Sequence, residues 1–325
     1  FYPYQWDLNY GNSTVFNDMT CNMLYLANRG IDVMRLDAVP YIWKELGTSC
    51  RNHPKVHTIV RMMRLVCEIV CPGVLLLGEV VMEPARVVPY FGTVEKPECH
   101  MLYNVTTMAS TWNTVATKDV ALLKRQMDQV SALPKDYVFL NYLRCHDDIG
   151  WGLDYDWLSR FEIDEAAHKK YLNDYLTGQW PGSDARGELY NNDPRLKDAR
   201  LCGTTASLSG LEAALYENDA EKTEKAVRLI EMLHAWLFVQ SGIPVLYSGD
   251  EVGALNDYSY KEDPYKKFDS RYLHRGRFPW ELTEGNAVSG RIFESLRNME
   301  MLRAAYGVFS GNAAVSTFDT GNSHV

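Results

Sequence analysis

The sequence predicts an α/β fold, and more specifically part of a (β/α)8 TIM barrel with parallel strands. Short apolar runs alternate with amphipathic helical stretches along most of the 325 residues, which is typical of parallel strands joined by crossover helices. Three of these runs end at an acid, namely Asp37, Glu79 and Asp147. In a barrel the carboxyl ends of the strands form the reactive face. No glycine-rich phosphate loop follows any run, which argues against a nucleotide-binding sheet.

The elements are expected to follow one another as strand and helix pairs. A first helix over residues 15–29 ends at Gly30, and the first buried strand lies within residues 30–39. We predict further strands at residues 74–79, 100–103, 137–143 and 243–247, and further helices at residues 54–70, 105–130, 165–176, 223–239 and 289–304. A barrel needs eight strand–helix units and only about five are present. We therefore expect a fragment of a longer protein that holds about strands 4–8.

Composition shifts along the chain suggest four parts. Residues 1–148 would form barrel strands 4–7. Residues 149–209 break the rhythm and are rich in Gly, Asp, Asn and Trp, so we expect an insertion subdomain on the catalytic face. Residues 210–308 would continue the barrel from helix 7 to helix 8. Residues 309–325 have strand character and would start a C-terminal β domain.

Charge and composition exclude several partners. The net charge is -9 and no basic run stands out, so we expect no nucleic-acid partner. No apolar run is long enough to cross a bilayer, so we expect no membrane partner. The seven cysteines form no paired CxxC motifs, which fits reduced thiols and a cytoplasmic location, although the absence of an initiator Met leaves secretion open. His and acidic residues are too scattered to predict a metal or another cofactor.

The strand-end acids suggest the chemistry of acetal cleavage. Arg35 and Asp37 are two apart on a strand and therefore share one face, so Asp37 is expected to stay ionised, as a nucleophile requires. Glu79 follows an apolar run that would raise its pKa, as an acid catalyst requires. Asp147 would hold sugar hydroxyls and stabilise developing charge. Each acid could instead be a structural ion pair, but three at matching strand ends favour catalysis.

Several motifs resemble a known family. The stretches GIDVMRLDAV at 30–39, LLLGE at 75–79 and RCHDD at 144–148, in this order, resemble conserved regions of glycoside hydrolase family 13, the alpha-amylase family. The stretches HDDIGW at 146–151, GSDARG at 182–187 and DSRYLHRGR at 269–277 are similar to amylosucrase and its sucrose-hydrolase relatives. The early region of the family on strand 3 is absent, and Gly78 before Glu79 is more typical of alpha-amylases.

The resemblance implies a retaining mechanism and a role for each motif residue. Asp37 would be the nucleophile, Glu79 the general acid/base and Asp147 the transition-state stabiliser, with the carboxyl groups of Asp37 and Glu79 about 5–5.5 Å apart. The donor would be sucrose or another α-glucoside, and the acceptor an α-glucan or water. Four further residues would bind or orient the substrate: Arg35 beside the nucleophile, His146 on a sugar hydroxyl, Asp148 near the acceptor, and Arg275 paired with an acid outside this sequence.

Other functions remain open at this point. An α-glucosidase or alpha-amylase-type hydrolase would use the same three acids. A non-catalytic family-13-like interaction domain would have lost catalytic acids, whereas all three are present here. A metal-dependent barrel isomerase would need more clustered His and acid ligands than the sequence offers.

Overall fold

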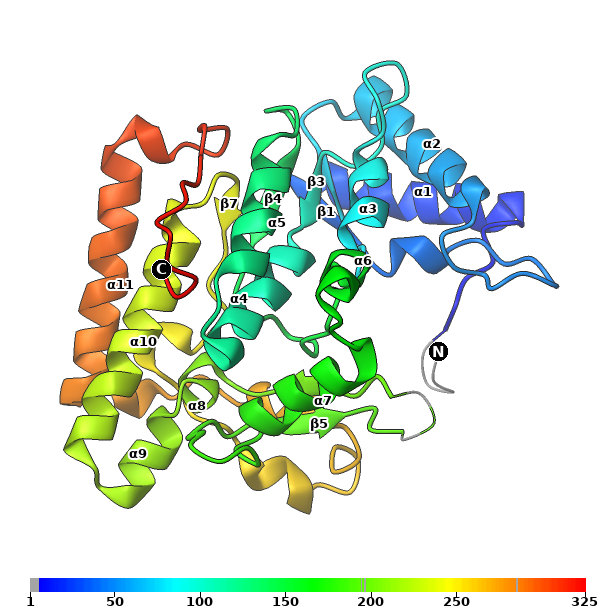
Figure 1. The fold of residues 1–325 in the computed structure, drawn as a ribbon. Coiled ribbons are helices and arrows are strands. Elements are labelled where there is room, and N and C mark those ends of the chain that lie inside the picture. Colours follow the sequence, from blue (N-terminus) through cyan, green and yellow to red (C-terminus); the bar gives the residue numbers. More distant parts are fainter. Residues whose placement is uncertain (1–5, 194, 196, 285) are drawn as a thin grey trace. The chain divides into compact units, whose positions relative to one another are not determined.

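The computed structural model describes residues 6–193, 195, 197–284 and 286–325 and forms two compact units (Figure 1). Residues 1–5 of the expected barrel part thus lie outside the described residues. The first unit comprises residues 1–103 and 134–140, and the second comprises residues 104–133 and 141–325. These boundaries differ from those expected at 148, 209 and 308, and the division into barrel parts and an insertion stays a prediction.

The first unit is built on parallel strands. Its helices are α1 (Ser13–Asn28), α2 (Pro54–Val70) and α3 (Pro84–Val87), and its strands are β1 (Val33–Leu36), β2 (Leu75–Gly78), β3 (Met101–Tyr103) and most of β4 (Val138–Asn141). The order β1-β2-β3-β4 is parallel throughout. The predicted α/β fold with a parallel sheet is therefore confirmed, and each predicted strand of this unit is present in shortened form.

Local sequence explains how this unit begins and packs. The Asn12 side chain caps α1 by accepting from the backbone N–H of Thr14 at 2.9 Å, and Gly30 follows the helix with a φ of 86°, which a glycine adopts without strain. The apolar faces of α1 and α2 and strands β1 and β2 share one core: Phe16, Met23, Met34, Ile59, Met63, Cys67, Val74 and Leu76. The expectation that β1 is fully buried is wrong, because Val33 is 42% exposed. This strand pairs with β2 alone within the described sheet.

Gly78, which comes directly before Glu79, occupies a tightly packed position. A Cβ atom at this position would lie 2.6 Å from Cys99 Sγ and 2.9 Å from a methyl of Leu102. Real side chains do not tolerate such contacts, so glycine lets β2 pack closely against β3. The glycine that departs from the amylosucrase pattern thus has a packing reason in this chain.

The second unit is mainly helical. Its helices are α4 (Val105–Thr117), α5 (Ala121–Ser131), α6 (Tyr155–Leu158), α7 (Glu165–Leu176), α8 (Thr205–Leu208), α9 (Leu211–Glu217), α10 (Ala220–Val239) and α11 (Ala287–Ala305), and its strands are β5 (Glu188–Tyr190), β6 (Arg200–Cys202) and β7 (Ile243–Pro244). Helices α8 to α11 surround a core formed by Ala206, Leu211, Ala226, Val227, Ile230, Ile292 and Leu296. After β7, the backbone N–H of Val245 donates to Asn141 O at the end of β4 at 2.8 Å.

The structure corrects several predicted elements here. The helix expected over residues 105–130 is broken at Lys118, whose φ is 61°, and forms α4 and α5. The strand expected over residues 243–247 contains only two residues. Within residues 149–209, α7 has the predicted bounds, but the antiparallel pair β5–β6 was not predicted.

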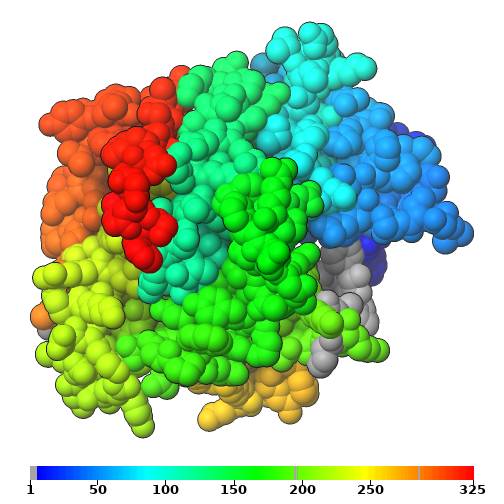
Figure 2. Space-filling model, viewed as in Figure 1, coloured from blue at the N-terminus to red at the C-terminus, as the bar shows by residue number. Residues whose placement is uncertain are grey.

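The final residues form no strand in this structure. Figure 2 shows the segment in red beside helices α4 and α5. The backbone N–H of Val120 donates to Ser323 O at 2.8 Å, and His324 Nδ1 lies 2.6 Å from Lys118 O. These contacts hold the segment against helix ends, and the C-terminal β domain stays a prediction. Among the described residues, no helix combines the length and apolarity needed to cross a membrane.

Candidate active site

The predicted site residues form two groups, one within each unit. The first group surrounds Arg35 at the end of β1. Arg35 Nη1 lies 2.5 Å from Asp37 Oδ1, and Arg35 Nη2 lies 3.0 Å from Glu79 Oε1. The second oxygen of Glu79 accepts from the backbone N–H of Ala38 at 2.8 Å. One guanidinium therefore bridges the two acids that follow β1 and β2. The shared strand face predicted the contact of Arg35 with Asp37, whereas its contact with Glu79 was not predicted.

The turn after β1 positions these groups. Ala38 has a φ of 44° and lies in the left-handed region, which an alanine rarely adopts. The N–H of the same residue donates to Glu79. Because the surrounding contacts hold a disfavoured backbone, the turn belongs to the kind of local strain that clusters at functional sites.

The electrostatics of this group differ from the expectation for Glu79. Desolvation lowers the pKa of Arg35, but the charges of Glu79 and Asp37 outweigh it and raise the pKa above its ordinary value. Asp37 is open to solvent, with its side chain 68% exposed, whereas that of Glu79 is 18% exposed. Glu79 was expected in an apolar setting. Instead its two oxygens meet a cation and an N–H donor.

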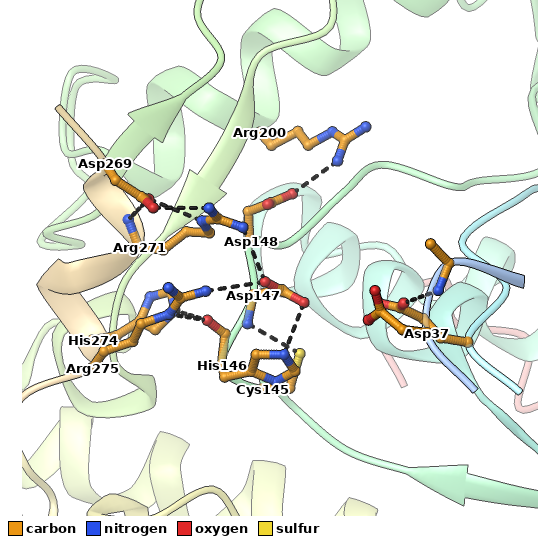
Figure 3. A network of polar contacts seen from close by, with 12 residues as sticks. Asp37, Cys145, His146, Asp147, Asp148, Arg200, Asp269, Arg271, His274 and Arg275 are labelled. Carbon is orange, nitrogen blue, oxygen red and sulfur yellow. Dashed lines mark hydrogen bonds and ion pairs between the residues drawn. The ribbon is translucent and has the colours of Figure 1, made fainter. Parts of the chain in front are cut away.

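The second group surrounds Asp147, which follows β4 in the chain (Figure 3). Arg271 Nη1 and Arg275 Nη2 approach Asp147 Oδ1 at 3.2 and 3.1 Å. His146 Nε2 lies 3.0 Å from Asp147 Oδ2. Arg275 also donates from Nε to the backbone oxygen of His146 at 2.6 Å. The structure thus brings together three predicted residues, namely His146, Asp147 and Arg275.

These contacts lower the pKa of Asp147 and raise the pKa of His146. Burial raises the pKa of Asp147, but the hydrogen bond and charge of His146, then Arg271 and Arg275, lower it to about 2. The hydrogen bond to Asp147 in turn raises the pKa of His146 to about 10. Asp147 is therefore a carboxylate and His146 an imidazolium at neutral pH. An ionised Asp147 suits the stabilisation of positive charge that develops nearby.

Asp148 lies in a different environment from its neighbour. Its buried carboxylate contacts Arg200 Nη1 of β6 at 3.2 Å. Burial raises the pKa of Asp148, and Arg200 opposes this effect. Two successive acids therefore have separate cationic partners.

Two sets of buried polar contacts support the segment that carries His146 and Asp147. Arg144 forms an ion pair with Asp250 Oδ1 at 2.8 Å, and Thr205 donates to the other oxygen at 3.0 Å. His274 Nδ1 accepts from the N–H of Gly203 at 3.1 Å, and its Nε2 lies 3.3 Å from His146 O. Burial lowers the pKa of His274 to about 3, so it is neutral, and accepting at Nδ1 leaves Nε2 to donate.

Three residues of the second group were not predicted: Arg200, Arg271 and Asp269, whose Oδ2 lies 2.8 Å from Arg271 Nη2. Arg271 precedes Arg275 by four residues, a spacing that places side chains near one another in a helical turn. This spacing was a usable signal. The pairing of Arg200 with Asp148 has no local signal, because the two residues are 52 positions apart and lie beside the bridge between Ile149 and Leu201. Within the described residues, no cluster of three or more His, Cys, Asp or Glu is arranged to hold a metal.

The raised pKa of His146 gives a testable pH dependence. Replacing His146 by Gln should lower the free energy of unfolding by up to about 1 kcal/mol, because the pair is partly exposed to solvent. A folded-state pKa above the unfolded value stabilises the protein fully below about pH 6.5. We expect the difference from the parent protein to shrink as the pH rises toward about 10. Urea unfolding at several pH values measures it, and a difference that stays constant from about pH 6 to about pH 10 would contradict the assignment.

Part of this chain matches a known protein family. Residues 1–151 match the family described as "Alpha amylase, catalytic domain". A glucosylglycerate phosphorylase of Spirochaeta thermophila is 36% identical over 146 residues, or 45% of this chain and 24% of that protein. A trehalose synthase/amylase of Mycolicibacterium smegmatis is 30% identical over 255 residues, or 78% of this chain and 37% of that protein.

One solved structure supports the barrel interpretation. The crystal structure of sucrose 6F-phosphate phosphorylase from Thermoanaerobacter thermosaccharolyticum superposes with a TM-score of 0.65 and 21% identity, covering 90% of this chain and 52% of that chain. At this identity the likeness concerns the fold. The chain also spans only part of its curated relatives, including 55% of a glucosylglycerate phosphorylase of Escherichia coli that is 26% identical.

The parallel strands with acids after their carboxyl ends define a barrel-type α/β protein. Residues 1–151 of this chain match the alpha-amylase catalytic domain, in agreement with the predicted family over that part of the chain. The closer resemblance to amylosucrase is a matter of proposal.

Proposed function

We propose that the protein containing this chain is a retaining, α-glucoside-active enzyme that forms a covalent glucosyl intermediate on Asp37. The observation that carries the proposal is the bridge formed by Arg35, which contacts Asp37 and Glu79 at once. Retaining enzymes need a nucleophile and an acid close together at the scissile bond. Two carboxylates on a single guanidinium meet that requirement, and their separation of about 5–5.5 Å stays a prediction.

The two acids would act in sequence. An oxygen of Asp37 attacks the anomeric carbon while the bond to the leaving oxygen breaks, and Glu79 gives that oxygen its proton. In the second half, Glu79 takes a proton from the acceptor, whose oxygen displaces Asp37. Arg35 approaches one oxygen of Glu79 and the Ala38 N–H donates to the other, so donor binding must weaken one of these contacts for that oxygen to carry a proton. The hydrogen bond from Ala38 and the ion pair with Arg35 are the two candidates.

The remaining site residues would bind the donor and acceptor. Asp147, ionised beside His146, would stabilise the positive charge that develops on the sugar. His146 would also bind a sugar hydroxyl. Arg275 would close the pocket behind the glucosyl ring, and Asp148 would lie toward the acceptor. We favour sucrose as donor with an α-glucan or water as acceptor, because the HDDIGW, GSDARG and DSRYLHRGR motifs resemble amylosucrases.

A second candidate is supported by the relatives. Three glucosylglycerate phosphorylases match this chain, over 45%, 46% and 99% of its length. A phosphorylase would use the same covalent intermediate but would pass the glucosyl unit to phosphate. The two candidates therefore differ in the acceptor and share the three acids.

One experiment separates these functions. The full-length protein would be incubated with sucrose and with α-glucosyl fluoride, in water, with a maltooligosaccharide, or with inorganic phosphate. Fructose or fluoride release together with glucan growth would support the amylosucrase-like function, and glucose 1-phosphate would support the phosphorylase. Hydrolysis of α-glucosyl fluoride without use of sucrose would favour an α-glucosidase or amylase. Failure to cleave either donor would contradict the enzymatic proposal and favour a non-catalytic domain.

A further inference from the structure

We propose that Arg271 is a positioning residue that fixes the orientation of the Asp147 carboxylate, with Asp269 as its anchor. This inference rests on the proposed function, in which Asp147 stabilises the transition state. Arg271 Nη1 lies 3.2 Å from Asp147 Oδ1. Figure 3 shows the Arg271 side chain between Asp269 and Asp147, in contact with both.

Arg271 is itself held rigidly. Its Nε donates to Asp269 Oδ1 at 2.9 Å, and its Nη2 donates to Asp269 Oδ2 at 2.8 Å. The backbone N–H of Arg271 donates to the same Oδ1 at 3.1 Å. The guanidinium lies 4.7 Å from the centre of the Tyr190 ring, on β5. A planar guanidinium that is bound through a bidentate pair has lost its freedom before substrate arrives.

A second aspartate–arginine pair with the same two-residue spacing serves as a comparison for Asp269 and Arg271. Arg195 also binds the aspartate two residues before it, with Nη2 2.7 Å from Asp193 Oδ2 and its backbone N–H on Asp193 Oδ1 at 2.9 Å. That arginine side chain is 88% exposed, whereas that of Arg271 is 14% exposed. The local Asp-x-Arg pair therefore forms without burial. Of these two pairs, the one at Arg271 combines burial, an aromatic neighbour and a contact to a predicted catalytic acid.

The arrangement around Asp147 explains why orientation matters more than charge alone. Arg271 and Arg275 approach one carboxylate oxygen, and His146 approaches the other. Donors on both oxygens resist rotation about the Cβ–Cγ bond. A carboxylate that meets charge developing on the sugar must be in place beforehand, because reorientation during the reaction costs activation free energy.

The insertion residues contribute to the same support. Tyr190 of β5 lies against Arg271, and Arg200 of β6 binds Asp148. The antiparallel pair thus contacts Asp148 directly and Asp147 through Arg271. In this arrangement the β5–β6 pair helps to position the side chains of Asp147 and Asp148.

The test uses the full-length protein and α-glucosyl fluoride, a donor that needs little acid assistance. R271M should lower kcat by about 10- to 100-fold with little change in KM, because Asp147 acts mainly in the transition state. R271K should recover part of this loss, since a lysine keeps the positive charge but does not form the two parallel hydrogen bonds of the guanidinium. D269N should lower kcat in the same way, because Arg271 is present but no longer anchored. Added guanidinium chloride should restore turnover of R271A, whereas potassium chloride at equal concentration should not.

The matched control is R195M, which removes the exposed counterpart and should leave kcat, KM and thermal stability unchanged. D147N in the same assay tests the proposed function on its own, since an active D147N protein would remove the role assigned to Asp147. If D147N is impaired while D269N and folded R271M keep the parent kcat, the positioning inference is wrong. If R271M fails to fold, the kcat of D269N and the guanidinium rescue of R271A test the positioning inference instead. Loss of thermal stability without loss of kcat in D269N would also overturn it.

Discussion

Replacing Asp37 by Asn in the full-length protein is expected to reduce turnover of α-glucosyl fluoride and sucrose by about 10⁴-fold or more. An amide is a poor nucleophile, and it cannot form the glucosyl ester through which a retaining enzyme works. Asp37 is also well placed to meet substrate, because its side chain is largely open to solvent while Arg35 holds one of its oxygens. Fluoride release and reducing-sugar assays measure the loss.

The control for this substitution is Asp32→Asn. Asp32 is also exposed and lies just before β1, at the opposite end of the strand. We expect the Asp32 variant to retain the parent rate. Because the amide oxygen introduced by Asp37→Asn should still accept from Arg35, the fold should persist, and circular dichroism and thermal unfolding check this. A folded Asp37→Asn protein with parent activity would show that Asp37 is only part of a structural ion pair.

The first group of site residues was largely predictable because it depends on the alternation of side chains along single strands. Alternation along a strand places Arg35 and Asp37 on one face, and the ion pair between them follows. Glu79 follows the neighbouring strand in register, since Leu36 pairs with Gly78. What the sequence did not predict is the Ala38 contact, because a left-handed alanine has no sequence signature. The contact of Arg35 with Glu79 was missed because it joins two strands that are distant in the sequence.

The second group was less predictable because its contacts are long-range. Asp147 and Arg271 are separated by 124 positions in the chain, and they meet through turns and short helices without a regular hydrophobic pattern. Strands of three residues such as β5 and β6 are too short to show alternation. The exposure of Val33 on β1 also depends on which strands lie beside it, which periodicity alone does not reveal.

The second large effect is expected for Glu79→Gln in the full-length protein. Turnover of sucrose should fall by about 10²- to 10⁴-fold, because the leaving oxygen no longer receives a proton. Attack by Asp37 on α-glucosyl fluoride should continue, because fluoride leaves with little protonation. The acceptor then lacks its base, so the glucosyl ester should accumulate.

Mass spectrometry of peptides from the Glu79→Gln protein treated with α-glucosyl fluoride should find one glucosyl unit on Asp37. Azide, an anion that attacks without a base, should release it as α-glucosyl azide and restore turnover. The matched control is Glu83→Gln, since Glu83 is also paired with an arginine, at 2.6 Å from Arg86 Nε, but lies at the surface. The control should behave as the parent protein. A Glu79→Gln protein that uses sucrose at the parent rate would show that another group is the acid, whereas azide giving the β-anomer would point to direct displacement and against a covalent Asp37 intermediate.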